Sequence, residues 1–267
     1  MKRVSLFLAV AGLTTMLVSG QKKETRQVSG FTGINASSAF DITVTKGNAE
    51  SLVVEADDEV MPYVRSEVRN GVLHLYLDND KKVKNIKTMK ASVVMKNLDK
   101  VSLSGASKLT ANDLFTSDSF KGDCSGATHM TVHLNTGKLN IDASGASKIQ
   151  LKANVSGHAN LDVSGASKIQ WELKAEKVQL DASGVSLVEL NGSATDFKVD
   201  VSGTSKVAAG DFKVKTATVE SSGTSKITVN VADALKVEAS GASSIEYQGS
   251  PTIEAKTGGA SKVRKIN

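Results

Sequence analysis

The stretch Ser-Gly-Ala-Ser-Lys at residues 144–148 is the key to the architecture, because the same five residues stand at 104–108 and 164–168 and near copies continue along the chain. Successive copies are 18 to 21 residues apart, counted between their glycines. A nearly fixed period of this length is typical of a solenoid, in which each repeat forms one turn of a coil stacked on the turn before it. The motif glycines are Gly105, Gly126, Gly145, Gly165, Gly184, Gly203, Gly223, Gly241 and Gly259.

Apolar and polar side chains alternate on both sides of each motif glycine. Ile141 and Ala143 precede Gly145, and Ile149 and Leu151 follow it, with polar residues between them. A period of two indicates β-strands that turn one face inward. Glycine suits the bend between the two strands because it adopts a positive φ without steric cost.

A second, looser corner is expected between successive motifs. Turn-forming residues gather there, as in Ser156-Gly157 and Asn191-Gly192-Ser193. Short strands joined by two corners are typical of a parallel β-helix, and the hexapeptide rhythm of left-handed forms is missing. We therefore predict an all-β fold: a single-stranded, right-handed parallel β-helix of about nine turns, each of 18 to 21 residues.

The first 20 residues have the pattern of a secretory signal peptide. Lys2 and Arg3 precede the apolar run Val4–Val18, which is too short to span a bilayer comfortably. We expect export to the periplasm, to the outer surface or into the medium. A lipoprotein is not predicted, because Gln21 stands where lipidation requires Cys. No later segment is a candidate for a transmembrane span.

Residues 21–100 lack the motif and are expected to form an N-terminal cap, mostly of β-strands, that continues into the solenoid at 101–267. Solenoids need an atypical terminal unit over the end of their core. A short helix is predicted over Asp58–Val68, interrupted by Pro62. The predicted strands are Ala39–Lys46, Ser51–Ala56, Gly71–Leu77 and Lys90–Met95.

Several stretches resemble one known family. They are Phe-Thr-Gly-Ile-Asn at 31–35, Asp-Ile-Thr-Val-Thr-Lys-Gly at 41–47, and Asn-Leu-Asp-Lys-Val-Ser-Leu-Ser-Gly-Ala-Ser at 97–107. Together with the repeats they resemble the family called "putative auto-transporter adhesin, head GIN domain", which is common in Bacteroidetes-type bacteria. The resemblance covers nearly the whole mature chain. It implies a β-helical protein that is secreted or held in the cell envelope, and it brings no catalytic residues with it.

Charge and cysteine content argue against several classes of function. Removal of the signal peptide leaves 31 basic and 28 acidic residues, and a net charge of +3 is too small to predict nucleic-acid binding. Cys124 is the single cysteine and falls at an inward position, which predicts a buried thiol rather than a disulfide. His129 and His133 fall at outward positions, so the three residues do not predict a metal site. No cofactor is expected.

Charged residues recur at fixed distances from the glycines and predict two outward rows. Acids stand three residues before most of the glycines, and lysines stand three residues after most of them. Acids stacked about 4.8 Å apart repel each other by about 0.9 kcal/mol per pair in bulk water, which favours a bound cation or basic ligand. The simpler interpretation is that charged rows keep a regular β surface soluble and discourage edge pairing. The candidate residues are Asp142, Asp162, Asp181, Asp200, Lys148, Lys168, Lys206 and Lys226.

These patterns favour a non-catalytic, exported scaffold, either adhesin-like or a cell-envelope binding protein, that presents a repetitive surface to a protein or glycan. A β-helix polysaccharide lyase or hydrolase is one alternative, but the acids are all repeat residues without a distinct cluster. A calcium-binding envelope protein is another, although calcium-binding β-rolls repeat every nine residues. Trp171 and Tyr247 fall at inward positions, which leaves no exposed aromatic platform for sugars. A homo-oligomer stays open, because an uncovered solenoid end invites pairing.

Overall fold

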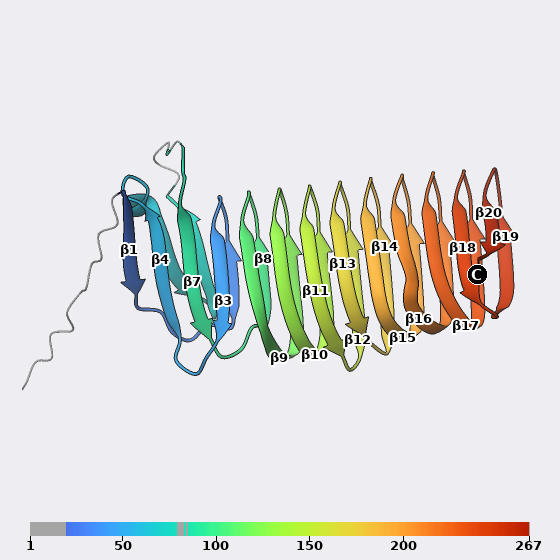
Figure 1. Cartoon of the computed structure of the whole chain (residues 1–267), viewed down its shortest axis with the longest axis horizontal. Helices are drawn as coiled ribbons and strands as arrows, with labels where there is room; N and C mark the ends of the chain where they lie inside the picture. The colour runs from blue at the N-terminus through green and yellow to red at the C-terminus, as the bar shows by residue number, and fades with distance from the viewer. Residues whose placement is uncertain (1–19, 79–82, 84, 267) are drawn as a thin grey trace, which may run out of the picture.

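The computed structural model describes residues 20–78, 83 and 85–266, and it is an all-β parallel solenoid of about nine turns, as the repeat predicts. The turns follow one another along the long axis of the molecule (Figure 1). The predicted signal peptide, apart from Gly20, lies outside the described residues. Within the described part of the chain, no helix has the length and apolar character needed to cross a membrane.

The described residues form twenty strands and one short 3-10 helix. They are β1 (Gln21–Arg26), β2 (Gly33–Ala36), β3 (Asp41–Lys46), β4 (Ser51–Asp57), η1 (Met61–Tyr63), β5 (Val64–Arg69), β6 (Val72–Leu77), β7 (Met89–Met95), β8 (Lys100–Leu103), β9 (Lys108–Cys124), β10 (His129–Ala143), β11 (Lys148–Val155), β12 (His158–Val163), β13 (Lys168–Lys174), β14 (Lys177–Ala182), β15 (Leu187–Val201), β16 (Lys206–Ser221), β17 (Lys226–Ala239), β18 (Ser244–Gly249), β19 (Thr252–Thr257) and β20 (Lys262–Lys265).

Each turn of the solenoid contributes to two faces. The residues that follow a motif glycine form the post-glycine face, where β11 pairs in parallel with β10 and β13. The residues that precede the next glycine form the pre-glycine face, where β12 pairs in parallel with β10 and β14. The glycine corner joins the two faces along one edge of the molecule, and the second corner joins them along the other. Several strands, including β10, bend through the second corner without a break.

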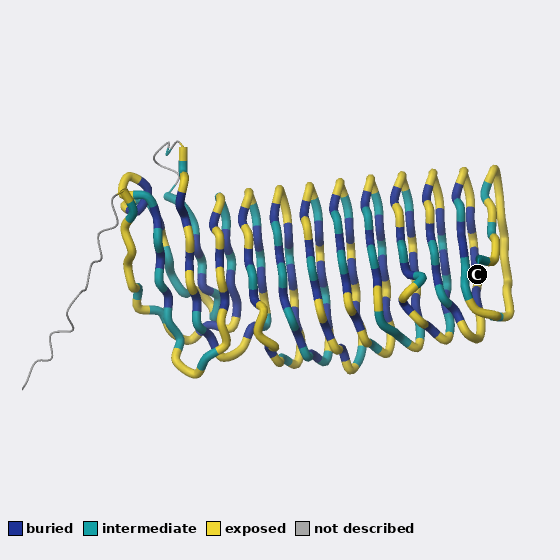
Figure 2. Tube along the Cα trace, viewed as in Figure 1, coloured by how far each residue is buried: buried dark blue, intermediate teal, exposed yellow. Residues whose placement is uncertain are grey.

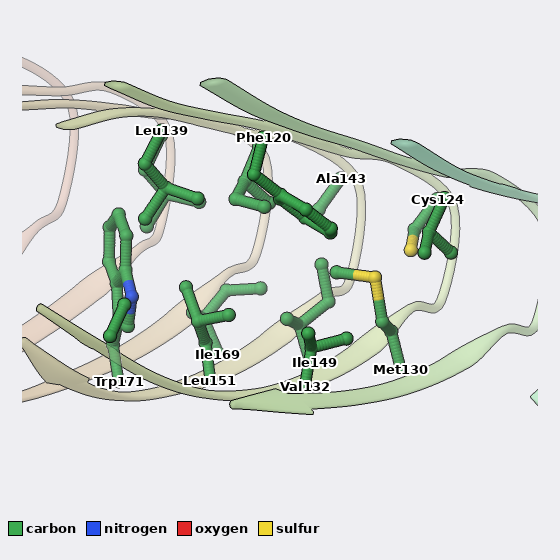
Figure 3. Close-up of a cluster of buried hydrophobic side chains, with 14 of the residues drawn as sticks. Phe120, Cys124, Met130, Val132, Leu139, Ala143, Ile149, Leu151, Ile169 and Trp171 are labelled. Atoms are coloured by element: carbon green, nitrogen blue, oxygen red, sulfur yellow. The ribbon is translucent and has the colours of Figure 1, made fainter. Parts of the chain in front are cut away.

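The core lies between the two faces and is filled by inward rows of apolar side chains. Ile149 is in register with Ile169, and Leu151 with Trp171, and all four side chains are buried (Figure 3). Buried and less buried residues alternate along most strands of the solenoid (Figure 2), as the period of two predicts, whereas β19 in the last turn is exposed throughout. The indole Nε1 of Trp171 is buried and has no hydrogen-bond partner among the described residues.

The glycine corners are stacked so closely that only glycine fits. Gly165 has a φ of +72°, and a Cβ added to it would lie 2.4 Å from the carbonyl oxygen of Gly145. That oxygen already accepts a hydrogen bond from the backbone N–H of Ala166 at 2.7 Å. The positive φ and the close approach both confirm the predicted role of the motif glycines.

The second residue after a motif glycine points inward, and its side chain makes a hydrogen bond within the corner. Ser167 is buried, and its hydroxyl donates a hydrogen bond to the carbonyl oxygen of Ser164 at 3.0 Å. A buried hydroxyl needs such a partner, and the short corner supplies one three residues earlier. The serines that make the equivalent bond in other turns are Ser107, Ser147, Ser186, Ser205, Ser225 and Ser243.

One turn of the solenoid is formed by the N-terminal segment. Strands β2 and β3 pair in parallel with β8 and β9, and Ser38 between them adopts a φ of +75°. Residues 47–99 are inserted after this turn. Within the insertion β6 and β7 extend the two faces in parallel, whereas β4 and β5 pair with them in antiparallel fashion. Strand β1 pairs with β4 at the end of the post-glycine face.

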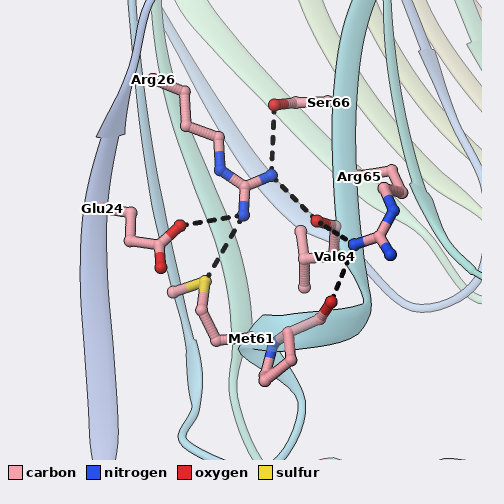
Figure 4. Close-up of polar contacts among 7 residues, drawn as sticks. Glu24, Arg26, Met61, Val64, Arg65 and Ser66 are labelled. Atoms are coloured by element: carbon pink, nitrogen blue, oxygen red, sulfur yellow. Dashed lines mark hydrogen bonds and ion pairs between the residues drawn. The ribbon is translucent and has the colours of Figure 1, made fainter.

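Arg26 joins the terminal strands of the two faces at this end of the molecule (Figure 4). Its guanidinium donates hydrogen bonds to the carbonyl oxygen of Val64 at 3.0 Å and to the hydroxyl of Ser66 at 3.2 Å. It also forms an ion pair with Glu24 at 3.1 Å. These contacts tie β1 to β5 over the end of the core.

The four strands predicted between residues 39 and 95 are present within two residues of their expected bounds. The helix predicted over Asp58–Val68 is wrong, because only η1 is helical and β5 follows it at once. Val64 and Val68 stand four residues apart, a spacing that fits a helix. Pairing of β5 with β6 along six residues overrides this local preference.

Candidate functional site

The acids three residues before the glycines form one continuous row, here called the acid row, on the pre-glycine face. Asp142 is in register with Asp162, Asp162 with Asp181, and Asp181 with Asp200. Their side chains point outward between inward-facing neighbours. The row consists of Asp123, Asp142, Asp162, Asp181, Asp200, Glu220 and Glu238.

Two carboxyl groups in this row have a raised pKa, chiefly because they are partly buried. Partial burial raises the pKa of Asp142, and a hydrogen bond with Asp123 raises it further. Partial burial is also the largest cause for Asp200, followed by the negative charges of Glu220 and Asp181. Like charges in neighbouring turns disfavour ionisation, as expected for a stacked row of acids.

Lysines on the same face neutralise the two ends of the acid row. The Nζ of Lys121 lies 3.2 Å from Asp123 and 3.6 Å from Asp142, and the Nζ of Lys236 lies 3.2 Å from Glu238. The middle of the row is different. Asp162, Asp181 and Asp200 form no ion pair with the described residues, and Asp181 accepts a hydrogen bond from Gln179 at 2.9 Å.

The lysines three residues after the glycines form a second row, the lysine row, on the post-glycine face. Lys148 is in register with Lys168, and Lys206 with Lys226, while Leu187 stands between the two pairs. The row consists of Lys108, Lys148, Lys168, Lys206, Lys226 and Lys262. The two rows occupy opposite faces on either side of the glycine corners, and no ion pair joins them among residues 20–78 and 85–266. The structure therefore brings the candidate residues together within each row but not between rows.

Three shallow hollows lie along the acid row, and the smallest, of about 290 Å³, is lined by Asp123, Asp142 and Asp162. The other two are larger. One has a volume of about 380 Å³ and is lined by Asp142, Asp162 and Asp181 together with Lys121. The other has a volume of about 520 Å³ and is lined by Asp200, Glu220 and Glu238 further along the row. Both are open depressions in a flat face, so a ligand on this face would meet several turns at once.

Another hollow, here called the corner groove, runs along the edge formed by the second corners. Its volume is about 530 Å³. The sequence predicts turn residues at this edge but carries no signal for a groove. The lining residues are Thr116, Ser117, Asn135, Thr136, Gly137, Asn154, Val155, Ser156, Lys174 and Ala175.

The thiol of Cys124 lies in the core, as predicted. It is 3% exposed, and burial raises its pKa to about 12. His129 and His133 alternate with buried residues and point outward. Across the part of the chain that the structure describes, no three His, Cys, Asp or Glu side chains gather as a metal site.

The family comparison matches the model described as "putative auto-transporter adhesin, head GIN domain" over residues 30–159 and 152–251. The chain belongs to this family. The match begins just before β2 and extends through β18, so it includes the acid row, the corner groove and the lysine row apart from Lys262. Comparison of this GIN-domain protein with the curated proteins gives no match.

Solved structures share the fold of this GIN-domain protein. A crystal structure named as a putative adhesin from Parabacteroides merdae has a TM-score of 0.72 and 19% identity, covering 93% of this chain and 97% of its own. A putative lipid binding protein from Parabacteroides distasonis has a TM-score of 0.70 and 17% identity, covering 93% and 97%. A putative adhesin from Bacteroides fragilis has a TM-score of 0.53 and 21% identity, covering 93% and 98%. At these identities the likeness shows the fold alone.

Proposed function

We propose that this GIN-domain protein is a non-catalytic, exported scaffold of the adhesin type, whose acid row and lysine row bind a repetitive ligand on a cell surface or envelope. Membership of the family supports an adhesin-like function. One observation carries the proposal: side chains of the same type are held in strict register over successive turns, as from Asp142 to Asp200. A surface built in this way is complementary to a partner that also repeats.

Multiple weak contacts explain how such a surface binds. A single exposed ion pair contributes about 0.2–1 kcal/mol, which is too little for recognition. Contacts repeated on a rigid frame act together, because each bound unit raises the effective concentration of the next. Asp162, Asp181 and Asp200 are the members best placed for this role, since they form no ion pair within the described residues.

The geometry of the acid row favours a scaffold over the two alternatives. Calcium takes six to eight oxygen ligands that converge on one point. Here each turn supplies one carboxylate, and successive carboxylates point the same way in single file. A glycan lyase or hydrolase needs acid and base groups placed around one bond. The rows instead repeat one side chain along a flat face.

The test is binding of the purified, fluorescently labelled protein to intact bacteria and to epithelial cells. We expect saturable binding that weakens with rising salt, because charged rows carry it. A variant with Asp162→Asn, Asp181→Asn and Asp200→Asn tests the acid row, and one with Lys148→Gln and Lys206→Gln tests the lysine row. Binding to neither cell type, or binding that both variants retain in full, would refute the proposal.

A further inference from the structure

The corner groove crosses four turns of the solenoid at their second corners. These corners lie along the lower edge of the molecule in Figure 1. Asn135 is in register with Thr116 on one side and with Asn154 on the other, and Asn154 is in register with Lys174. Consecutive turns therefore place one polar side chain each along its wall. In a parallel stack these positions repeat about every 4.8 Å.

Glycines at the second corner allow successive turns to stack closely at this edge. A Cβ on Gly137 would lie 2.6 Å from the carbonyl oxygen of Asp118, and one on Gly157 would lie 2.9 Å from the carbonyl oxygen of Gly137. Strand β11 ends at Val155 and β12 begins at His158, so the chain turns sharply at this point. The corner has no large side chain to fill the space beside the amide wall.

Several hydrogen-bond donors and acceptors along the wall of the groove have no partner among the described residues. The Nδ2 of Asn154 donates to the Oδ1 of Asn135 at 3.0 Å, which fixes the orientation of both amides. Among the described residues, no partner is found for the amino group of Asn135, the carbonyl oxygen of Asn154, or the hydroxyls of Thr116 and Ser156. An amide donor and an amide acceptor thus stand one turn apart, both facing solvent in the groove.

The lining combines polar walls with a partly apolar floor. Val155, Ala175 and Gly137 contribute carbon surface, and Lys174 is the only charged residue among the ten that line the groove. A sugar ring has the matching chemistry, because its hydroxyls both donate and accept while its C–H faces are apolar. The spacing of about 4.8 Å between turns is close to the length of one residue in an extended β-1,4-linked glycan.

We propose that the corner groove binds a linear, uncharged glycan that lies along the solenoid axis, with one sugar residue per turn. This inference goes beyond the proposed function, because it assigns a second binding surface, with its own ligand class, to an edge that contains no residue of the acid row or the lysine row. An extended peptide fits less well, because it rises about 3.3 Å per residue and would lose register with the turns. A polyanion fits less well, because one lysine is the only positive charge that the groove offers.

Calorimetric titration of the purified protein with four extended hexasaccharides tests the proposal: the β-1,4-linked oligomers of glucose, mannose, xylose and N-acetylglucosamine. We expect at least one to bind. The double variant Asn135→Ala, Asn154→Ala is expected to weaken its affinity at least tenfold, because it removes two hydrogen-bonding groups. Raising the salt concentration is expected to leave the affinity unchanged.

A matched control is available on the flat post-glycine face. The Nε2 of Gln150 donates to the Oε1 of Gln170 at 3.2 Å, so these residues form an amide pair across adjacent turns outside the groove. The variant Gln150→Ala, Gln170→Ala is expected to bind the hexasaccharide as the parent does. Equal melting temperatures of both variants will show that each is folded.

Failure to bind any of the four hexasaccharides would overturn the proposal, as would equal weakening by the groove and control variants. Cell binding by the groove variant and by the row variants distinguishes this proposal from the proposed function. If the groove variant binds cells as well as the parent while the row variants do not, the rows act without the groove. If binding to cells falls with the groove variant alone, the groove carries the adhesion.

Discussion

Ser38 occupies the same corner position as Gly105, directly before it in the stack. Ser38 has a φ of +75° and Gly105 one of +70°. The carbonyl oxygen of Ser38 accepts a hydrogen bond from the N–H of Ala106 at 2.6 Å, and a Cβ on Gly105 would lie 2.4 Å from that oxygen. The first corner thus has the same positive φ and the same stacking as the glycine corners, but its residue is serine.

Replacing this serine is expected to stabilise the protein. A left-handed φ is unfavourable for a residue with a Cβ, so Ser38→Gly should raise the free energy of unfolding by about 0.5–1 kcal/mol. Urea denaturation followed by circular dichroism measures this. Ser38→Ala serves as control, because it keeps the Cβ, and no gain is expected. A loss of stability in Ser38→Gly would mean that the serine side chain contributes more than its backbone strain.

The stacked glycines are predicted to be the most sensitive surface positions of the molecule. Gly165→Val should destabilise the fold by a few kcal/mol, because its Cβ would meet the backbone of Gly145 and its φ is positive. Adjacent residues in the same corner should tolerate change. Ala166→Val is expected to be nearly neutral, since Val185 occupies the equivalent place and is 65% exposed.

Lys168→Ala extends the same comparison to the lysine row. Its side chain is 44% exposed and its ion pair with Glu189 is 3.9 Å long, so we expect a change of about 0.5 kcal/mol or less. Thermal melting of the three variants in parallel gives the ranking. Similar shifts for Gly165→Val and Lys168→Ala would contradict the close stacking of the corner.

Asp200 is predicted to reduce stability at neutral pH. Its pKa is raised in the folded protein above the ordinary value of 3.8. Between that value and the raised pKa the folded state binds more protons than the unfolded state, so the contribution of Asp200 to stability falls as pH rises. Asp200→Asn should therefore raise stability slightly at pH 7, by about 0.5 kcal/mol or less for an exposed group.

The pH dependence of the Asp200→Asn variant tests whether the charge of Asp200 causes this gain in stability. The gain from Asp200→Asn should vanish below pH 3.8, where the carboxyl group is protonated in both states. High salt should also reduce it, because salt screens the repulsion from Glu220 and Asp181. Thermal melts between pH 3 and pH 8 at two salt concentrations provide the measurement. A lower melting temperature at pH 7 would show that the row is held by attractive contacts instead.

Glu246 is predicted to secure the last described turn. Its side chain is 8% exposed, accepts a hydrogen bond from Arg264, and lies 3.3 Å from the Nζ of Lys226. These contacts, with Arg264 the largest cause, hold the pKa of Glu246 below its ordinary value of 4.5. Glu246→Gln should destabilise the protein by roughly 1 kcal/mol at pH 7, because the pairing of β20 with β18 is weakened.

The stability that Glu246 contributes changes with pH in the opposite direction to that of Asp200. The stability that Glu246 contributes is complete above 4.5 and is lost as pH falls through its lowered pKa. The difference between Glu246→Gln and the parent should therefore close in acid. Glu254→Gln, at an exposed position of β19, is the control and should change stability little. A constant difference from pH 3 to pH 7 would exclude the ion pair as its source.

Cys124 is predicted to be unreactive until the solenoid opens. Its thiol is buried and its pKa is raised to about 12 by burial, so almost no thiolate is present at neutral pH. Labelling with iodoacetamide should be negligible in buffer and fast in concentrated urea. Rapid labelling of the native protein at pH 7.5 would show that this turn opens locally.

Periodic features could be predicted from sequence because each depends on neighbours along the chain. The strands, the inward position of Trp171 and the bend at Gly165 all follow from alternation and from a glycine at a fixed interval. The first corner could not be predicted in this way because Ser38 carries no glycine signal. The helix expected over Asp58–Val68 failed because pairing between β5 and β6 outweighs local preference.

The sequence alone determines the solenoid, its two faces and the rows on them. The period of two within strands decides which side chains point outward, and the nearly constant interval between glycines decides which of them lie in the same row. The hollows and the partners of individual side chains emerge only when the turns are stacked. The groove beside Asn135 and Asn154, and the burial of Glu246 under Arg264, depend on residues 18 or 19 positions apart that meet in adjacent turns. Such contacts depend on the register between stacked turns and on side-chain packing, and neither can be read from a local sequence pattern.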